Sequence, residues 1–497
     1  MAMAIFDWFV KAFFGRGAAK SSAPKLALAE ETPAKASTGT PIGVVTTQKP
    51  PNAPAADNLR PSVADDQGGQ NAAASDPSEV RILLVPFRRD REGKFTQRFS
   101  ETLKNGQMIS VREVAEGPSM PGPRPTTQQA AALFTDAAVM LDREGADLLI
   151  LGDLSKAGLR LVFLPSELPS EGRPDGFGLG DALLVSPNFD ATIANLIYAT
   201  VLSAALPMKP KIRSVLASHL MGAVQQALAL LNEDSVQESQ DQTASVLTYL
   251  AVTAATVWRL NGKPEGLATA VNAYRRALRD GPKEVTPLVV GELKIRLGSA
   301  LKELGVATGD LNLFEEAADA LESIGAVLSR KTHLREWGLA YQGLGDVLLV
   351  RGKQEMESSD CANAIVAFDA ALEVFTQQSH LARWIDVMNQ RGAAFMTWGA
   401  IEAGTKELDG AITAYRAVLA ERNQSANPML WAHASNNLGS AAFALAKRVR
   451  DPELLREAAG CFDAAVLIYE QHGHTSAAEI IRKNIQRVER LQAAGGA

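Results

Sequence analysis

The sequence has little of several features that would place it in a specific functional class. Its 497 residues include only two cysteines, too far apart to form a metal-binding motif, and they give no reason to expect export for disulfide formation. The formal net charge is −6, so we expect no nucleic-acid partner. No catalytic triad or metal-ligand spacing stands out. We therefore predict a protein that is not an enzyme and that has no catalytic residues, cofactor or metal.

The first 16 residues lack both a basic start and a long apolar run. A secretory signal normally begins with basic residues, and a membrane-spanning helix needs about 20 predominantly apolar residues. Asp7, Lys11 and Gly15 instead form a narrow polar stripe on a helical wheel. We predict an amphipathic helix at 1–16 that docks on a membrane or in a partner's groove, with packing on the protein's own body as the alternative. The predicted docking residues are Phe6, Trp8, Phe9, Phe13 and Phe14.

Residues 17–77 contain no aromatic residue and eight prolines, and are otherwise rich in Ala, Ser, Thr and Gly. Such a composition buries too little apolar surface to offset the loss of chain entropy on folding. We predict a disordered linker that makes the N-terminal helix a tethered module. The expected location is cytoplasmic, with peripheral contact at the inner membrane.

Strand and helix patterns alternate from residue 78 onwards. Segments 81–87, 146–152 and 159–163 have the length and apolar character of strands, 108–114 reads as extended, and 95–103 and 128–143 have helical periodicity. The sequence thus predicts a small α/β domain at 78–165. Its Val-Pro-Phe strand end and its later Ala-Asp-Leu-Leu-Ile-Leu-Gly strand are similar to the N-terminal domain of TolB-like envelope proteins, which implies a fold and no activity. Residues 166–242 follow as a loop and a helical hairpin, which fits a degenerate leading repeat.

The C-terminal half repeats with a fixed period of 47 residues. Each unit carries a small residue, then an alanine 19 positions later, then a large residue four positions after that alanine. We predict that the large residue fills the space that small residues leave between two antiparallel helices. The small series is Ala251, Gly298, Gly345, Gly392 and Gly439; the alanines are Ala270, Ala317, Ala364, Ala411 and Ala458; the large series is Tyr274, Leu321, Phe368, Tyr415 and Phe462.

Leu-Gly followed by Ala-x-x-x-Tyr/Phe-x-x-Ala-Leu resembles the tetratricopeptide repeat, whose usual length is 34 residues. We expect the extra residues in longer loops, such as 447–453. The resemblance implies a mainly α fold: a tetratricopeptide-like α-solenoid with five repeats at 243–473 and a capping helix and tail at 474–497. Trp337, Trp384 and Trp431 share the period, and we interpret them as packing between repeats.

In tetratricopeptide proteins the first helix of each pair lines a concave groove. Three residues before each glycine marker stand Gln342, Asn389 and Asn436, whose carboxamides can both donate to and accept from a peptide backbone. They resemble the asparagine ladders that some family members use, although solvated polar positions are the alternative interpretation. The earlier repeats carry Thr248 and Ile295 at this position. Further groove candidates are Asp346, Asp386, Met396, His433 and Phe443.

The function that these features favour is a bacterial, non-enzymatic scaffold or adaptor that binds a protein partner in the groove. The alternative is a ligand-sensing regulator whose α/β domain binds a small anion. That alternative draws on a basic cluster, for which a solvated charged loop is the simpler interpretation. The cluster consists of Arg88, Arg89, Arg91, Lys94 and Arg98.

Overall fold

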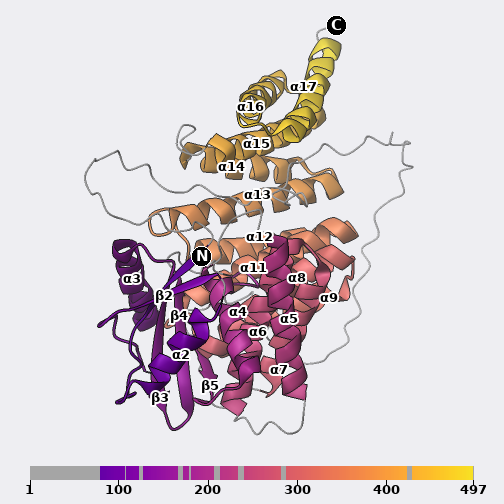
Figure 1. The fold of residues 1–497 in the computed structure, drawn as a ribbon. Helices are drawn as coiled ribbons and strands as arrows, with labels where there is room; N and C mark the ends of the chain where they lie inside the picture. Colours follow the sequence, from indigo (N-terminus) through magenta and orange to yellow (C-terminus); the bar gives the residue numbers. More distant parts are fainter. Residues whose placement is uncertain are drawn as a thin grey trace, which may run out of the picture. The chain divides into compact units, whose positions relative to one another are not determined.

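The computed structural model describes residues 79–495, except 107, 123–126, 166–171, 178–180, 206–212, 233–239, 281–286 and 422–427. The fold is mainly α, with a small α/β domain before a series of helix pairs (Figure 1). This confirms the predicted fold class. The predicted helix at 1–16 and the linker at 17–77 lie outside the described residues.

The α/β domain is built on one mixed five-stranded sheet with the order β2-β1-β3-β4-β5. The first three strands in this order are parallel, whereas β4 and β5 add as antiparallel neighbours. The pairing is fixed by apolar runs in which successive side chains point to opposite faces. The strands are β1 (Val80–Leu84), β2 (Ile109–Glu113), β3 (Leu148–Ser155), β4 (Gly158–Pro165) and β5 (Leu183–Val185).

Helices cover both faces of this sheet. Helix α3 (Thr127–Glu144) buries Phe134 and Leu141 against one face, together with Leu149 and Val162 of the central strands. On the other face, Phe163 of β4 lies with its ring centroid 5.5 Å from that of Tyr249 in the first long repeat helix. Two further helices contact strands of the sheet: α2 (Lys94–Lys104) packs on β2, and α4 (Ala191–Ala205) packs on β3 and β4.

The sheet continues past the boundary that the sequence predicts at residue 165. Strand β5 pairs with β4 in the register Leu161↔Leu183, and α4 packs on the same sheet. The predicted hairpin at 166–242 therefore divides: α4 contacts both the sheet and the helices, whereas α5 (Arg213–Asn232) packs on α4 and on the first repeat helix. A three-residue strand carries too little periodicity to be recognised from sequence.

The repeats are antiparallel helix pairs that contact mainly their neighbours along the chain, as expected for a solenoid. Their long first helices begin at intervals of 47 residues, and α17 at the C-terminal end keeps the same interval. The first helices are α6 (Gln240–Asn261), α8 (Pro287–Thr308), α11 (Leu334–Glu355), α13 (Leu381–Glu402), α15 (Pro428–Val449) and α17 (Thr475–Gly495). The second helices are α7 (Pro264–Asp280), α9 (Asn312–Glu322) with the short α10 (Ile324–Val327), α12 (Ser358–Leu372), α14 (Thr405–Glu421) and α16 (Pro452–Gln471).

Within each pair the extra length lies in the helices, not in the longer inner loop that the sequence predicts. Each of the five first helices that begin a pair has 22 residues. The predicted loop at 447–453 is mostly helical, because α15 continues to Val449 and Asp451 already caps α16 by accepting a hydrogen bond from the Glu453 backbone N–H. Only Arg450, in the left-handed region at φ 57°, and Asp451 separate the two helices.

The predicted packing of small against large residues is confirmed by the geometry. A Cβ atom added to Gly345 would lie 2.5 Å from the ring of Phe368, and one added to Gly298 would lie 2.7 Å from Leu321. The last two pairs repeat this arrangement. An added Cβ atom would lie 2.7 Å from the Tyr415 ring at Gly392 and 3.0 Å from the Phe462 ring at Gly439. The missing side chains therefore let the two helices of each pair approach closely.

A second layer of this packing follows one heptad further along the first helices. Gly305 lies against Phe314, and Gly399 lies against Leu408, both with distances of about 3 Å from an added Cβ. These positions keep the 47-residue period and extend the contact along the two helices of these pairs.

None of the helices in the described part of the chain is both long enough and apolar enough to cross a membrane.

Candidate partner-binding face

Part of the long connection between β4 and β5 lies against the first two repeats. The ring of Phe177 packs 5.8 Å, centroid to centroid, from that of Tyr249, and a Cβ on Gly172 would lie 3.8 Å from Ile295. We call the contacting side chains of the repeats the α6–α8 face. This face consists of Tyr249 and Arg259 on α6, Tyr274 on α7, and Ile295 and Arg296 on α8.

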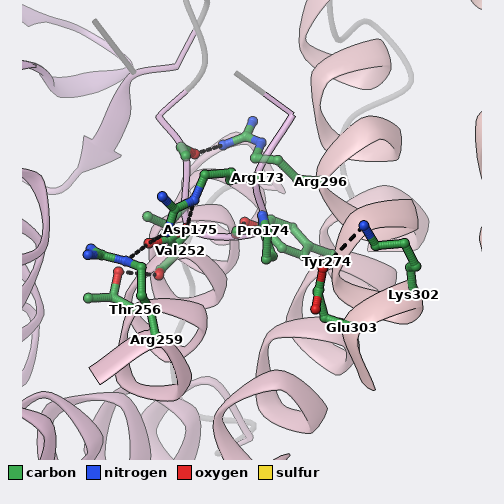
Figure 2. A network of polar contacts seen from close by, with 11 residues as sticks. Arg173, Pro174, Asp175, Val252, Thr256, Arg259, Tyr274, Arg296, Lys302 and Glu303 are labelled. Carbon is green, nitrogen blue, oxygen red and sulfur yellow. Dashed lines mark hydrogen bonds and ion pairs between the residues drawn. The ribbon is translucent and has the colours of Figure 1, made fainter. Parts of the chain in front are cut away.

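The segment binds this face through its main chain as well as its side chains (Figure 2). The Tyr274 hydroxyl donates a hydrogen bond of 2.6 Å to the carbonyl oxygen of Pro174. The Arg296 guanidinium donates to the carbonyl oxygen of Gly176 at 3.3 Å. Main-chain carbonyls held by side chains of a helical face are a common feature of peptide recognition.

Two carboxylates of the segment form ion pairs with arginines of the face. Asp181 accepts from both terminal nitrogens of Arg296, at 2.5 and 2.8 Å, and these two side chains are only 3% and 4% exposed. Asp175 accepts from Arg259 and also from Arg173, the latter at 3.1 Å (Figure 2). Charges this deeply buried are tolerated only when each has a well-placed partner.

The Arg296–Asp181 pair changes the acidity of its surroundings. Burial by itself lowers the pKa of Arg296, but the charge of Asp181 raises it above its ordinary value. Glu292, one helical turn before Arg296, is 6% exposed. Burial, and then the negative charge of Asp181, raises the pKa of Glu292 from 4.5 to about 8. Burial thus favours the neutral form of Glu292, and Asp181 is the carboxylate that pairs with Arg296.

The three predicted groove amides occupy the register of Ile295 on α11, α13 and α15. Gln342 is half-buried, and its carbonyl oxygen accepts a 2.9 Å hydrogen bond from Arg383. Asn389 is also half-buried, and its Oδ1 has no hydrogen-bond partner within the described residues. Asn436 is fully buried, so an approaching partner meets its neighbours before its own side chain.

The other predicted groove residues divide into polar and packing positions. Asp386 is exposed, whereas Asp346 lies 4.0 Å from Lys302, and burial raises the pKa of Asp346 to about 6. His433 shares a 2.8 Å hydrogen bond with the hydroxyl of Tyr469. The two apolar candidates contribute to packing and not to an accessible face, since Met396 and Phe443 are 7% and 2% exposed.

Of the tryptophan series, Trp384 packs between repeats as predicted, whereas the contacts given for Trp337 lie within its own helix and the residues just before it. Trp337 is 4% exposed, with its ring 4.1 Å from Tyr341 and the Arg330 guanidinium 4.7 Å from its ring centroid. Trp384 packs on a cluster that joins α13 and α14 to Ala434 of α15, which is a contact between repeats.

The basic cluster after β1 makes mostly internal contacts. Arg88 donates to the carbonyl oxygen of Met120 at 3.3 Å, and Arg89 forms a 2.6 Å ion pair with Asp153. Arg98 donates to the carbonyl oxygen of Phe189 at 3.2 Å. Three of the five basic side chains thus hold the α/β domain together, and an anion site at this place stays a prediction.

The α6–α8 face was not predicted from sequence. Its ion pairs join residues 84 and 115 positions apart, and no spacing rule connects them. The available signal was the pair of charged residues Glu292 and Arg296 within an otherwise apolar stretch of a repeat helix. Within the described residues, no group of three or more metal-ligating side chains comes together.

No protein-family model matches the chain, and no curated protein matches it. Among solved structures, the crystal structure of BtubC (BKLC) from P. vanneervenii is similar, with 19% sequence identity and a TM-score of 0.35. The similarity covers 52% of this chain and 92% of that chain. A likeness of this degree supports no inference about activity or partners.

Proposed function

We propose that this chain is a non-enzymatic scaffold or adaptor of the tetratricopeptide type, which binds an extended segment of a protein partner along α11, α13 and α15. The observation that carries the proposal is the binding of a polypeptide segment on the α6–α8 face. That face already holds main-chain carbonyls and side chains of an irregular segment. The same register of first helices continues through the later repeats, and extended concave surfaces of this kind are those that solenoids use for binding.

The later repeats differ from the α6–α8 face in the chemistry they offer. The position of Arg296 is occupied by Gly343, Gln390 and Asn437 in the next three repeats, and the position of Ile295 by the three predicted amides. Of these amides, Gln342 and Asn389 are partly accessible, whereas Asn436 is fully buried. Carboxamides both donate and accept, so they suit a peptide backbone more than a charged side chain. We therefore expect the partner segment to be bound largely through its main chain.

The proposal includes a tether. The predicted amphipathic helix at 1–16 would hold the assembly at the inner face of a membrane or on a larger complex, with a cytoplasmic location for the repeats. Removal of residues 1–16 should move the protein from the membrane pellet to the supernatant. If the shortened chain still sediments with membranes, the tether does not reside in this helix.

The binding surface is tested by placing a photo-crosslinking residue at Asp386, which is exposed on α13. We expect discrete crosslinked products in the native host, identified by mass spectrometry. The matched control carries the crosslinker at Gln378, which is exposed outside this register. The Gln342→Ala/Asn389→Ala variant should reduce the Asp386 crosslinks several-fold. Equal crosslinking from both positions, or no effect of the alanine variant at unchanged helicity, would refute the proposal.

A further inference from the structure

The connection that crosses the α6–α8 face is much longer than the sheet requires. Strands β4 and β5 are adjacent and antiparallel, and such strands are commonly joined by about two to five residues. Here β4 ends at Pro165 and β5 begins at Leu183, so 17 residues (166–182) lie between them. The excess includes the residues that bind the repeats. Sheet geometry therefore does not account for the segment.

The contacts of the segment resemble those of a bound ligand and not those of a packed core. Three of its groups enter the face: the carbonyl oxygens of Pro174 and Gly176, and the carboxylate of Asp181. In addition, the carboxylate of Asp175 reaches Arg259. The described residues of the segment, 172–177, 181 and 182, lie in neither helix nor strand, so these polar contacts, with the ring of Phe177, hold them in place.

The face itself needs an acidic occupant. Arg296 is 3% exposed, and the same buried environment contains Glu292 and Glu336. Arg335 forms a 3.0 Å ion pair with Glu336, while Arg296 has the carboxylate of Asp181. A buried guanidinium without a carboxylate partner is strongly disfavoured. A segment that replaced residues 173–177 and Asp181 would therefore match Arg296 best if it supplied a carboxylate at the position of Asp181.

We propose that the α6–α8 face is a binding site for an extended acidic segment, that residues 173–177 and Asp181 occupy it as an internal ligand, and that a partner segment of the same chemistry can replace them. The required chemistry is two carboxylates six residues apart, as in Asp175 and Asp181, with main-chain carbonyls on the two residues that flank the first carboxylate, as in Pro174 and Gly176. This inference deepens the proposed function, on which it rests for the idea that the repeats bind extended polypeptide. It adds a second, acid-selective site that the chain itself occupies.

The internal ligand has a large advantage over a free one, because both its ends are tethered. Short tethers give effective concentrations in the millimolar range. A free peptide should therefore bind only when the internal segment is weakened. The Asp175→Asn/Asp181→Asn variant of the full chain removes the two carboxylates and keeps the size of their side chains.

The probe is a fluorescently labelled synthetic peptide with the sequence of residues 172–181, GRPDGFGLGD. We expect fluorescence polarisation to show at least tenfold tighter binding to the Asp175→Asn/Asp181→Asn variant than to the natural chain. Adding Arg259→Gln and Arg296→Gln to that variant should abolish the gain. A control peptide with asparagine at both acidic positions should not bind.

Three results would overturn the inference. These are equal binding to the natural chain and the variant, binding that does not depend on the two arginines, and no binding to a variant that keeps the natural circular dichroism spectrum. If the double variant does not fold, Asp175→Asn alone weakens the internal segment more mildly, leaves the face intact and is tested in the same way. The Gln342→Ala/Asn389→Ala variant should leave peptide binding unchanged, so this site and the proposed α11–α15 surface can fail separately.

Discussion

The close approach of the two helices in each repeat gives a sharp prediction at Gly345. An added Cβ there would lie 2.5, 2.7 and 2.9 Å from three atoms of the Phe368 ring, which is fully buried. Real Cβ atoms essentially never come this close to a neighbour, so Gly345→Ala must push the ring or separate α11 from α12. The first repeat has Ala251 at this register, which indicates that a helix pair can adjust to one methyl group when the rest of its packing is built for it.

The size of the stability change in Gly345→Ala follows from two opposing effects. Alanine is better than glycine in a helix interior by about 1 kcal/mol. Overpacking a core by one carbon typically costs about 1–3 kcal/mol. Gly460 on α16 is the matched control, since it is exposed within a helix and has no atom within 4 Å of an added Cβ. Because the helix-propensity gain is common to both sites, Gly345→Ala should be less stable than Gly460→Ala by about 1–3 kcal/mol.

The assay is hydrogen exchange followed by mass spectrometry on peptides from α11 and α12, because repeat arrays need not unfold in one step. Exchange in these helices should accelerate in Gly345→Ala, whereas Gly460→Ala should slow exchange in α16. In a Phe368→Ala background the clash is gone, so the added methyl group should become stabilising. Two results would show that the repeat is not explained by the packing of small residues against large ones. Either Gly345→Ala is as stable as Gly460→Ala, or Gly345→Ala still lowers stability when the Phe368 ring has been removed.

Two further predictions concern buried polar groups. Tyr274 and Tyr415 occupy the same repeat position, but only Tyr274 donates a hydrogen bond, to Pro174, whereas the Tyr415 hydroxyl has no partner within the described residues. Tyr274→Phe should therefore lower the free energy of unfolding by about 1–2 kcal/mol, measured by thermal or urea unfolding, and Tyr415→Phe should leave it unchanged or raise it slightly. An equal loss in both variants would contradict the difference in hydrogen bonding between the two hydroxyls. Because the folded-state pKa of Glu292 is raised by burial from 4.5 to about 8, its contribution to stability is full below about pH 4.5 and is lost as the pH rises toward 8. Glu292→Gln should flatten this decline in melting temperature between pH 5 and 8.5, and an unchanged pH profile would show that Glu292 does not titrate in this way.

The sequence was most informative where a pattern repeats. The 47-residue period, set by small and large residues such as Gly298 and Leu321, predicted which side chains meet between the helices of a pair. Repetition makes this possible because each unit meets the same packing requirement, and the shared solution becomes visible when the units are compared. The strands at 81–87 and 146–152 were likewise predicted, from short apolar runs that have the length of a buried strand.

The sequence was less informative where the repeats depart from their own pattern. The expected loop at 447–453 is mostly helix, because helical propensity and the cap at Asp451 act on these residues directly. The usual length of a tetratricopeptide repeat, on which the expectation rested, has no such local effect. Strand β5 and the extent of the sheet escaped notice, because three residues paired across a long connection leave no periodic signal. The candidate groove amides were placed in the correct register, but whether they contact a partner stays a prediction.

What the sequence determined by itself is the repeated helix pair, because its cause lies within one repeat and its immediate neighbours. What only the tertiary structure decided is the α6–α8 face. Asp181 and Arg296 lie 115 residues apart, and nothing in either segment identifies the other. The fold brings the connection between β4 and β5 against the repeats, where the buried Arg296 is paired with the carboxylate of Asp181. A local pattern can be recognised in a single sequence, whereas a unique long-range ion pair is known only once the fold has brought its members together.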